Sequence, residues 1–240
     1  MGDIVGFYAN PFAQGFLYSK GKFTTIACNG GNNTGANGIN DNGVIVGTCE
    51  GLGQGFIYRN GKYTYVAYPK AKATWLGGIN NKGEIVGGYF GPGPKYIQHG
   101  FVYFNGTFTL LPSSVQGAVG INNNGTIAGY SCSNQVCSGV LLTKGPKGWQ
   151  VRQKIVYPGA ANTFPNGIND NGDLAGYWTP GPNTPGSAFV YLKNTNSFVP
   201  LDFGNNNGSI AGGINNSGEI VGEYTIGGGG VINGFYGSLQ

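Results

Sequence analysis

The sequence predicts an all-β fold: a single β-propeller of four-stranded blades that spans residues 1–240. Three observations support this prediction. One motif recurs at intervals of 40 to 47 residues, the segments around it are rich in Val, Ile, Tyr, Phe and Thr, and no segment shows helical periodicity. A β-solenoid would use shorter coils and a β-sandwich would not repeat its sequence, so the propeller is favoured over both.

The first motif predicts two strands joined by a tight turn, which we call strands A and B of the repeat. Gly-Ile-Asn begins each copy, and two polar residues, Gly, a variable residue, Ile or Leu, Val or Ala, and Gly follow. Asn and Asp nucleate turns, and the central Gly is free to adopt positive φ. The copies begin at Gly38, Gly78, Gly120, Gly167 and Gly213.

The second motif, Gly-Phe-x-Tyr followed by a turn and a Thr-bearing segment, predicts strands C and D. The turn contains Asn60-Gly61 in one copy and Asn105-Gly106 in another, which is the strongest short hairpin signal. Clear copies begin at Gly15, Gly55 and Gly100, and weaker ones at Gly139, Ala188 and Gly234.

The strand count leaves two blade numbers open. Six B–C pairs are expected, but only five A strands and five D strands, which gives 22 strands. The favoured fold has six blades, of which the first is incomplete. In the alternative, a five-bladed propeller, the D strand near residues 23–26 joins the last A, B and C strands, and the hairpin of residues 2–19 is surplus.

The repeat resembles a family of bacterial extracellular repeats named after a His-Ala-Phe tripeptide (HAF repeats). The resemblance rests on Gly-Ile-Asn-x-x-Gly-x-Ile-Val-Gly, on His99-Gly100-Phe101 and on Ala188-Phe189, and it covers nearly the whole chain. Most copies have Gly-Phe without the His. The resemblance implies a secreted or surface-exposed propeller, and it brings no catalytic residues with it.

Composition excludes several classes of function. The net charge is +4 and the basic residues are scattered, so a nucleic-acid partner is not expected. No stretch of 18 apolar residues could span a membrane, and no signal peptide is present in this chain, although export remains open. No cofactor motif is present: the run at 227–230 is Gly-rich, but no Lys-Ser or Lys-Thr follows it.

The four cysteines do not have the spacing of a zinc site, so no metal is expected. Cys132 and Cys137 flank a short loop between strands B and C of one blade, and we expect them to form a disulfide. The pairing of Cys28 and Cys49 is left open.

No catalytic residue is expected, and the chain is predicted not to be an enzyme. His99 is the only imidazole, and no Gly-x-Ser-x-Gly motif accompanies it. Four acids share one repeat position, just before the Ile or Leu of strand B: Asp3, Glu84, Asp173 and Glu219. They could form a cation site or a pair for glycoside cleavage, but solvated strand starts explain them more simply.

A ligand is expected at the long B–C and D–A loops, because function concentrates in variable loops on a rigid scaffold. The candidate ligand-binding residues are Phe12, Trp75, Tyr96 and Trp178. They could stack on sugar rings, or alternatively cap the apolar space between blades. The leading function is therefore a non-catalytic extracellular binding or scaffold propeller, with a glycan or cell-surface polymer as ligand.

Two other functions remain open. The chain could be a structural protein that self-assembles by exchange of its terminal hairpins, residues 4–18 and 220–236, because an unpaired sheet edge captures another strand. It could also be a glycan-active enzyme that uses the shared acids.

Overall fold

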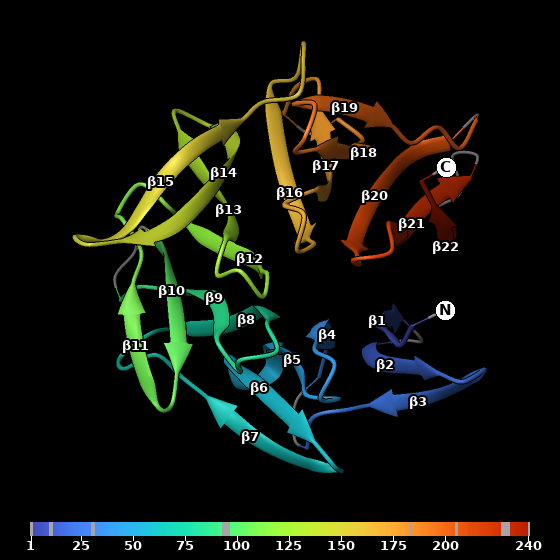
Figure 1. Ribbon diagram of the computed structural model, residues 1–240. Coiled ribbons are helices and arrows are strands. Elements are labelled where there is room, and N and C mark those ends of the chain that lie inside the picture. The colour runs from blue at the N-terminus through green and yellow to red at the C-terminus, as the bar shows by residue number, and fades with distance from the viewer. Residues whose placement is uncertain are drawn as a thin grey trace. The chain divides into compact units, whose positions relative to one another are not determined.

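The structure is a computed structural model that describes residues 2–9, 12–29, 32–92, 97–182, 184–204, 206–226 and 231–239. These residues contain 22 strands and one helix, the three-residue 3₁₀ helix η1 (Glu50–Leu52). The strands form six antiparallel sheets that follow one another along the chain (Figure 1). The number of strands is the number predicted from the motifs.

Four sheets have all four strands in the order A, B, C, D. The first and last sheets have three strands each: β1–β3 lacks strand A, and β20–β22 lacks strand D. The sheets are β1 (Ile4–Ala9), β2 (Ala13–Ser19), β3 (Lys22–Ile26); β4 (Thr34–Ile39), β5 (Ile45–Cys49), β6 (Gln54–Arg59), β7 (Lys62–Val66); β8 (Ala73–Ile79), β9 (Ile85–Phe90), β10 (Gln98–Phe104), β11 (Thr107–Leu110); β12 (Gly117–Ile121), β13 (Ile127–Ser133), β14 (Val136–Gly145), β15 (Gly148–Ile155); β16 (Asn162–Ile168), β17 (Leu174–Thr179), β18 (Ser187–Leu192), β19 (Ser197–Pro200); and β20 (Asn206–Ile214), β21 (Glu219–Ile226), β22 (Val231–Ser238).

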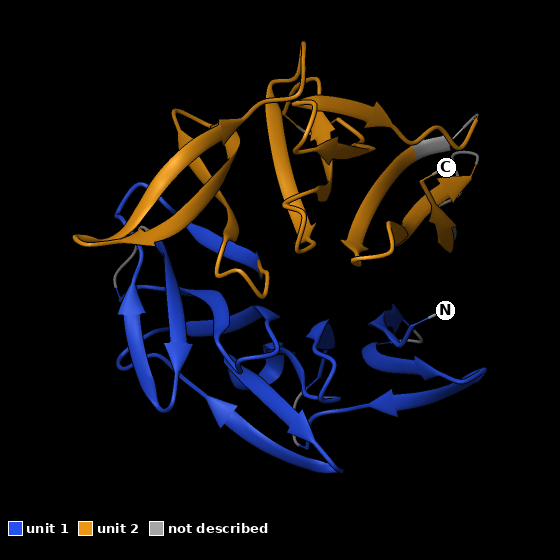
Figure 2. Cartoon of the chain, viewed as in Figure 1, with its two compact units in different colours: residues 1–120 blue, residues 121–240 orange. Residues whose placement is uncertain are grey.

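This architecture is that of a six-bladed β-propeller, as predicted, with one blade per sheet. The five-bladed alternative is wrong, because β3 pairs with β2 from Gly15↔Ile26 to Ser19↔Lys22 and so belongs to the first sheet, not the last. The chain divides into two compact units, residues 1–120 and 121–240, and the division falls within β12 (Figure 2).

Each unit has a core formed between sheets that are neighbours in sequence. In unit 1, Ile26 of the first sheet packs with Phe56 of the second, and Val46 of the second packs with Leu76 of the third. In unit 2, Val190 of the fifth sheet packs with Ile220 of the sixth. The Phe of Gly-Phe-x-Tyr is fully buried in three copies, and burial of such a ring contributes roughly 2–3 kcal/mol. These residues are Phe56, Phe101 and Phe189.

The A strands of neighbouring sheets approach closely where both have glycine. A Cβ on Gly167 would lie 2.8 Å from Cα of Gly213, and a Cβ on Gly38 would lie 3.0 Å from Cα of Gly78. An asparagine amide also links each pair of strands: Asn166 Nδ2 donates to the carbonyl oxygen of Ala211 at 3.0 Å. The small residues of strand A therefore serve sheet-to-sheet packing.

The C–D hairpins have the turns that the sequence predicts. Asn60-Gly61 has φ angles of 50° and 80°, and Asn105-Gly106 has 48° and 81°. Two consecutive positive φ angles define a type I′ turn, which matches the twist of the flanking strands.

Candidate functional site

The asparagines of Gly-Ile-Asn organise the A–B turns. In each turn the Asn Oδ1 accepts the backbone N–H four residues later, as Asn122 does from Thr126 at 2.8 Å. The Asn Nδ2 donates to the equivalent carbonyl oxygen of the next repeat: Asn122 to Asn169 at 2.9 Å in unit 2, and Asn40 to Asn80 at 3.0 Å in unit 1. The motif thus joins neighbouring repeats, which is a structural role.

The acids that share one repeat position are held by these asparagines. Glu84 accepts from Asn80 Nδ2 at 2.8 Å, Asp173 from Asn169 Nδ2 at 3.0 Å, and Glu219 from Asn215 Nδ2 at 2.6 Å. Three of the four acids therefore bind within their own turn. Across the residues that the structure describes, no group of three or more His, Cys, Asp and Glu side chains is placed to hold a metal ion.

Asp170 lies at the centre of a second polar network between turns of unit 2. It accepts hydrogen bonds from Asn123 N at 2.8 Å, Asn123 Nδ2 at 2.9 Å and Asn216 Nδ2 at 2.7 Å. Burial acts to raise the pKa of Asp170, but these hydrogen bonds outweigh it and hold the pKa below its ordinary value.

Cys132 and Cys137 form the predicted disulfide. They face each other directly across the β13–β14 hairpin, with their Cα atoms 4.1 Å apart. The bond closes the end of this hairpin and fixes the geometry of its tip.

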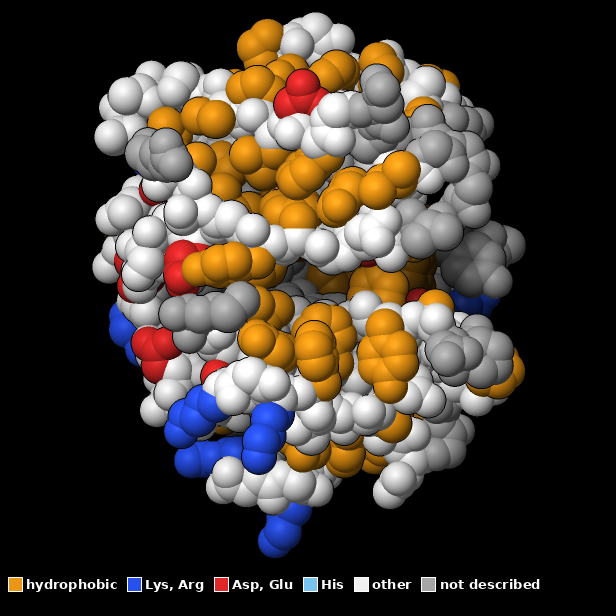
Figure 3. All heavy atoms as spheres, turned by 90° about the vertical axis from the view of Figure 1, so that its right-hand side faces the viewer, with side chains coloured by type: hydrophobic (Ala, Val, Ile, Leu, Met, Phe, Trp, Pro, Cys, Tyr) orange, Lys and Arg blue, Asp and Glu red, His pale blue; other side chains and the backbone are white. Residues whose placement is uncertain are grey.

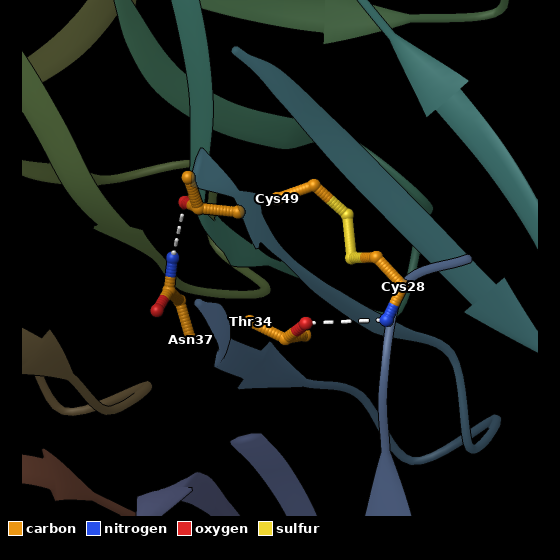
Figure 4. The surroundings of a disulfide bond; sticks show 5 residues. Cys28, Thr34, Asn37 and Cys49 are labelled. Carbon is orange, nitrogen blue, oxygen red and sulfur yellow. Dashed lines mark hydrogen bonds between the residues drawn. A yellow bond between two sulfur atoms is a disulfide. The ribbon is translucent and has the colours of Figure 1, made fainter. Parts of the chain in front are cut away.

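Cys28 and Cys49 form a second disulfide, which the sequence left open (Figure 4). Cys28 follows β3, and Cys49 ends β5 of the next sheet, so the bond joins two sheets. Other repeats have stacked aromatic rings at the equivalent two positions, which we call the linker position and the end of strand B. These pairs are Tyr68–Tyr89 at 3.8 Å, Tyr157–Trp178 at 4.7 Å and Phe203–Tyr224 at 5.0 Å between ring centroids.

Of the four aromatic residues predicted to bind a ligand, two lie in unit 1, one lies in unit 2 and one lies outside the described residues. Phe12 is exposed beside β2, while Trp75 lies in β8 with its ring over Gly88 of the adjacent strand. These two belong to unit 1 and make no ring contact with each other. Trp178 belongs to unit 2 and is stacked on Tyr157, and Tyr96 lies outside the described residues. Ligand binding by these residues stays a prediction.

The sole histidine also has a packing partner. His99 stacks on Tyr89 with ring centroids 5.1 Å apart. Tyr89 in turn stacks on Tyr68. This arrangement gives the side chain of His99 a role in packing.

Unit 2 contains an aromatic cluster that sequence reasoning missed, formed by Tyr130 of β13, Phe164 of β16 and Tyr177 of β17. Tyr130 and Phe164 contact edge-to-face at 5.9 Å, and Phe164 and Tyr177 stack at 5.1 Å. All three rings are half-buried. Burial, and then the proximity of Tyr177, raise the pKa of Tyr130 to about 12, so both phenols remain neutral donors at physiological pH.

The signal for this cluster was present in the repeat. Tyr130 and Tyr177 directly follow the Gly that ends Ile-Ala-Gly and Leu-Ala-Gly, and the same position has Glu223 in the last sheet. Glu223 is half-buried, and burial raises its pKa. Unlike the carboxylates of the turn acids, the carboxylate of Glu223 makes no hydrogen bond to any residue that the structure describes. Its two oxygen atoms could accept hydrogen bonds from a ligand.

Comparisons with known proteins show the fold of this chain but not its function. No family model matches the sequence, and no curated protein matches it. Among solved structures, TolB from Acinetobacter baumannii is similar with a TM-score of 0.63 and 9% identity, over 93% of this chain and 60% of that one. The chain therefore spans less than two thirds of the TolB chain.

A second similar structure is a protein described as a candidate gluconolactonase. It has a TM-score of 0.56 and 11% identity, and the match covers 95% of this chain and 83% of that one. At these identities the likeness shows the propeller fold alone. Across the described part of the chain, no helix has the length and apolarity to cross a membrane.

Proposed function

We propose that this chain is a non-catalytic binding propeller and that the aromatic cluster of unit 2 binds a carbohydrate or another surface polymer. The observation that carries the proposal is that Tyr130, Phe164 and Tyr177 are adjacent and half-buried. A sugar ring presents apolar C–H faces that pack on aromatic rings, and its hydroxyls need donors and acceptors. Two neutral phenols supply both.

The state of the acids supports binding rather than glycoside hydrolysis. Hydrolysis needs two carboxyl groups that face a common bond, one to protonate the leaving group and one to attack or activate water. Glu84, Asp173 and Glu219 instead accept hydrogen bonds from the asparagines of their own turns. Their repeated position follows from the repeat itself.

The two disulfides support an extracellular location. Stable disulfides are typical of proteins that fold in an oxidising compartment, and rare in the reducing cytosol. We place the chain outside the cell or at its surface on this ground and on the resemblance to HAF repeats.

A glycan array followed by calorimetry with each hit tests the binding site. Tyr177→Ala should weaken binding of a hit at least tenfold, which corresponds to about 1.4 kcal/mol, because it removes one ring and one hydroxyl from the cluster. Tyr65→Ala is the matched control, since Tyr65 is an exposed tyrosine on β7 in unit 1. The proposal fails if no glycan binds, or if both variants bind like the wild type.

A hydrolase screen tests the alternative of a glycan-active enzyme. We expect no turnover of chromogenic glycosides. Turnover that disappears in Glu84→Gln or Glu219→Gln would show that the turn acids are catalytic and would overturn the proposal.

A further inference from the structure

Glu223 of the last sheet occupies the repeat position that Tyr130 and Tyr177 occupy in the two sheets before it. Each of these residues follows the Gly of Ile-Ala-Gly, Leu-Ala-Gly or Ile-Val-Gly in strand B. Tyr177 is paired with Phe164 of strand A in the fifth sheet, and Glu223 is paired with Ile210 of strand A in the last sheet. Because paired residues of an antiparallel sheet point to the same face, each pair presents two adjacent side chains.

The packing of neighbouring sheets continues this row of side chains from the aromatic cluster to the last sheet. Tyr130 of the fourth sheet contacts Phe164 of the fifth at 5.9 Å between ring centroids. Ile210 has the same repeat position as Phe164, three residues before the Gly of Gly-Ile-Asn. By this equivalence Ile210 lies toward Tyr177, and Glu223 lies beside Ile210 on the next strand.

A backbone contact places Tyr177 beside β20 without use of the repeat. A Cβ on Gly186 would lie 2.7 Å from the ring of Tyr177, so this ring rests on the segment that leads into β18. The carbonyl oxygen of Gly186 accepts the N–H of Ser209 at 2.8 Å. Ser209 directly precedes Ile210 in β20. The segment around Gly186 thus links the Tyr177 ring to the part of β20 that pairs with Glu223.

The charge of the Glu223 carboxylate is not compensated by any residue that the structure describes. This side chain is half-buried, and burial is the cause of its raised pKa. A nearby cation or hydrogen-bond donor would oppose that rise. On the side of the molecule that bears the last sheet, acidic side chains lie among hydrophobic ones (Figure 3). Because folding has already removed part of the hydration of Glu223, a cationic ligand would gain its attraction without the cost of desolvating it.

We propose that the aromatic cluster and Glu223 form one site for an amino sugar, whose ring packs on Tyr177 and whose protonated amine binds the Glu223 carboxylate. The inference rests on the proposed function and names its class of ligand. An ammonium group donates three hydrogen bonds, and the faces of tyrosine rings also attract a cation.

A metal ion fits the position of Glu223 less well than an amine does. An ion such as Ca²⁺ takes about six to eight oxygen ligands, several of them from carboxylates. Within the described ranges of the chain, Glu223 belongs to no group of three or more side chains that could hold a metal ion. A single carboxylate beside aromatic rings is sufficient for an ammonium group.

Calorimetry at pH 6.5 with two tetrasaccharides tests the inference. One is a tetramer of glucosamine, which carries protonated amines, and the other is the same tetramer fully N-acetylated, which is neutral. The wild type should bind the glucosamine tetramer at least about tenfold more tightly, as expected for a hydrogen bond between charged groups. Glu223→Gln should reduce this preference to less than about twofold and leave the affinity for the acetylated tetramer unchanged, because the neutral ligand does not use the charge.

Glu219→Gln is the matched control for the loss of one negative charge from β21. The Glu219 carboxylate is held by Asn215 Nδ2 at 2.6 Å within its own turn, so this variant should keep the preference for the glucosamine tetramer. Equal affinity of the wild type for the two tetramers overturns the inference. A preference that survives in Glu223→Gln, or that disappears equally in Glu219→Gln, also overturns it.

Tyr177→Ala separates a failure of this inference from a failure of the proposed function. The variant should weaken the binding of both tetramers, because both pack on the same ring. If it does so but the wild type has no preference for the amine, the aromatic cluster is a carbohydrate site to which Glu223 does not belong. If neither tetramer binds, the inference is overturned, and the glycan array decides the proposed function by itself.

Discussion

At the scale of single residues, the asparagine of Gly-Ile-Asn has a task that few other side chains can do. Its Oδ1 accepts backbone N–H groups inside the turn, and its Nδ2 donates to the next repeat and to the turn acid. Aspartate offers no donor, and serine is too short to span both directions. The hydrogen-bonding capacity of this one amide therefore explains why the Asn of Gly-Ile-Asn recurs in every copy of the motif.

Asn169→Ala should lower the free energy of unfolding by about 2 kcal/mol, because the variant removes a buried amide together with its hydrogen bonds to its own turn and to the next repeat. Asn169 is buried, and it bonds the backbone N–H of Asp173 at 2.9 Å and the carbonyl oxygen of Asn215 at 3.3 Å. Urea unfolding measures the change. Asn194→Ala, at an exposed turn, should change stability by less than about 0.5 kcal/mol. Equal effects of the two variants would contradict the structural role of the motif.

Glu223 should make the folded protein less stable as pH rises, which is the opposite of the usual effect of an acidic side chain. Burial raises its pKa in the folded state above the ordinary 4.5, so the folded chain holds the proton more tightly than the unfolded chain does. The stability from this group is full below the unfolded pKa and is lost as pH rises through the folded pKa. Glu223→Gln should remove that loss and stabilise the protein at neutral pH relative to the wild type.

The measurement for Glu223 is the difference between the melting temperatures of wild type and Glu223→Gln from pH 4 to pH 8. The difference should grow in favour of the variant as pH rises. A constant difference, or one that favours the wild type at neutral pH, would show that the Glu223 carboxylate is well solvated or paired.

At the scale of elements, the Cys28–Cys49 disulfide and the aromatic stacks are two ways to join neighbouring sheets at the same repeat positions. Each links the segment after a D strand to the end of strand B in the next sheet. Thr34 Oγ1 accepts the N–H of Cys28 at 3.1 Å, as Thr74 does for Tyr68, so the backbone around the disulfide matches that around a stack (Figure 4).

Removal of this disulfide should cost more than removal of the hairpin disulfide. Cys28–Cys49 closes a separation of 21 residues and Cys132–Cys137 one of 5, so chain entropy predicts about 3 and about 2 kcal/mol respectively. Calorimetry of the double Ala variants tests the order. Cys28→Tyr with Cys49→Tyr should recover part of the loss by forming a stack. A tyrosine pair less stable than the alanine pair would refute the equivalence.

Close packing of A strands makes a second prediction at this scale. Gly167→Ala should destabilise the protein by about 2 kcal/mol, because the new methyl would meet backbone atoms of Gly213 and Ile214 that have little freedom to move. Gly212→Ala, on β20 itself, meets only Val221 O at 3.7 Å and is the control. Comparable melting temperatures for both variants would show that these strands separate easily.

A structural feature could be predicted from the sequence when the residues that cause it lie close together in the chain. Turn chemistry and the Gly-Phe-x-Tyr hairpins are encoded within a few residues, so the six B–C pairs and the Cys132–Cys137 bond followed from the sequence. The Cys28–Cys49 bond depends on contact between two sheets. The aromatic cluster also depends on contact between two sheets, because Tyr130 of β13 meets Phe164 of β16, and the repeat position of Tyr130 and Tyr177 does not by itself reveal that contact.

At the scale of the whole molecule, the cores lie between sheets that are adjacent in sequence. The cluster around Phe56 uses the first and second sheets, and the cluster around Phe101 uses the second and third. Proteins built in this way behave as repeat arrays, whose stability is approximately a sum of terms within repeats and between neighbours. A block of three consecutive sheets should therefore contain most of the interactions that hold it together.

The fragment of residues 1–113, which ends between β11 and β12, tests this prediction. It contains three sheets and the clusters around Phe56 and Phe101, so it should have the circular dichroism of a β protein and unfold cooperatively in urea. Its m-value should be roughly half that of the full chain, because m scales with the surface exposed on unfolding. A cut after residue 90 is the control, since it separates β9 from β10 and removes Phe101 from its cluster; this shorter fragment should be largely unfolded. A disordered 1–113 fragment would mean that the sheets of unit 1 depend on the rest of the chain, and that stability is not a sum over neighbours.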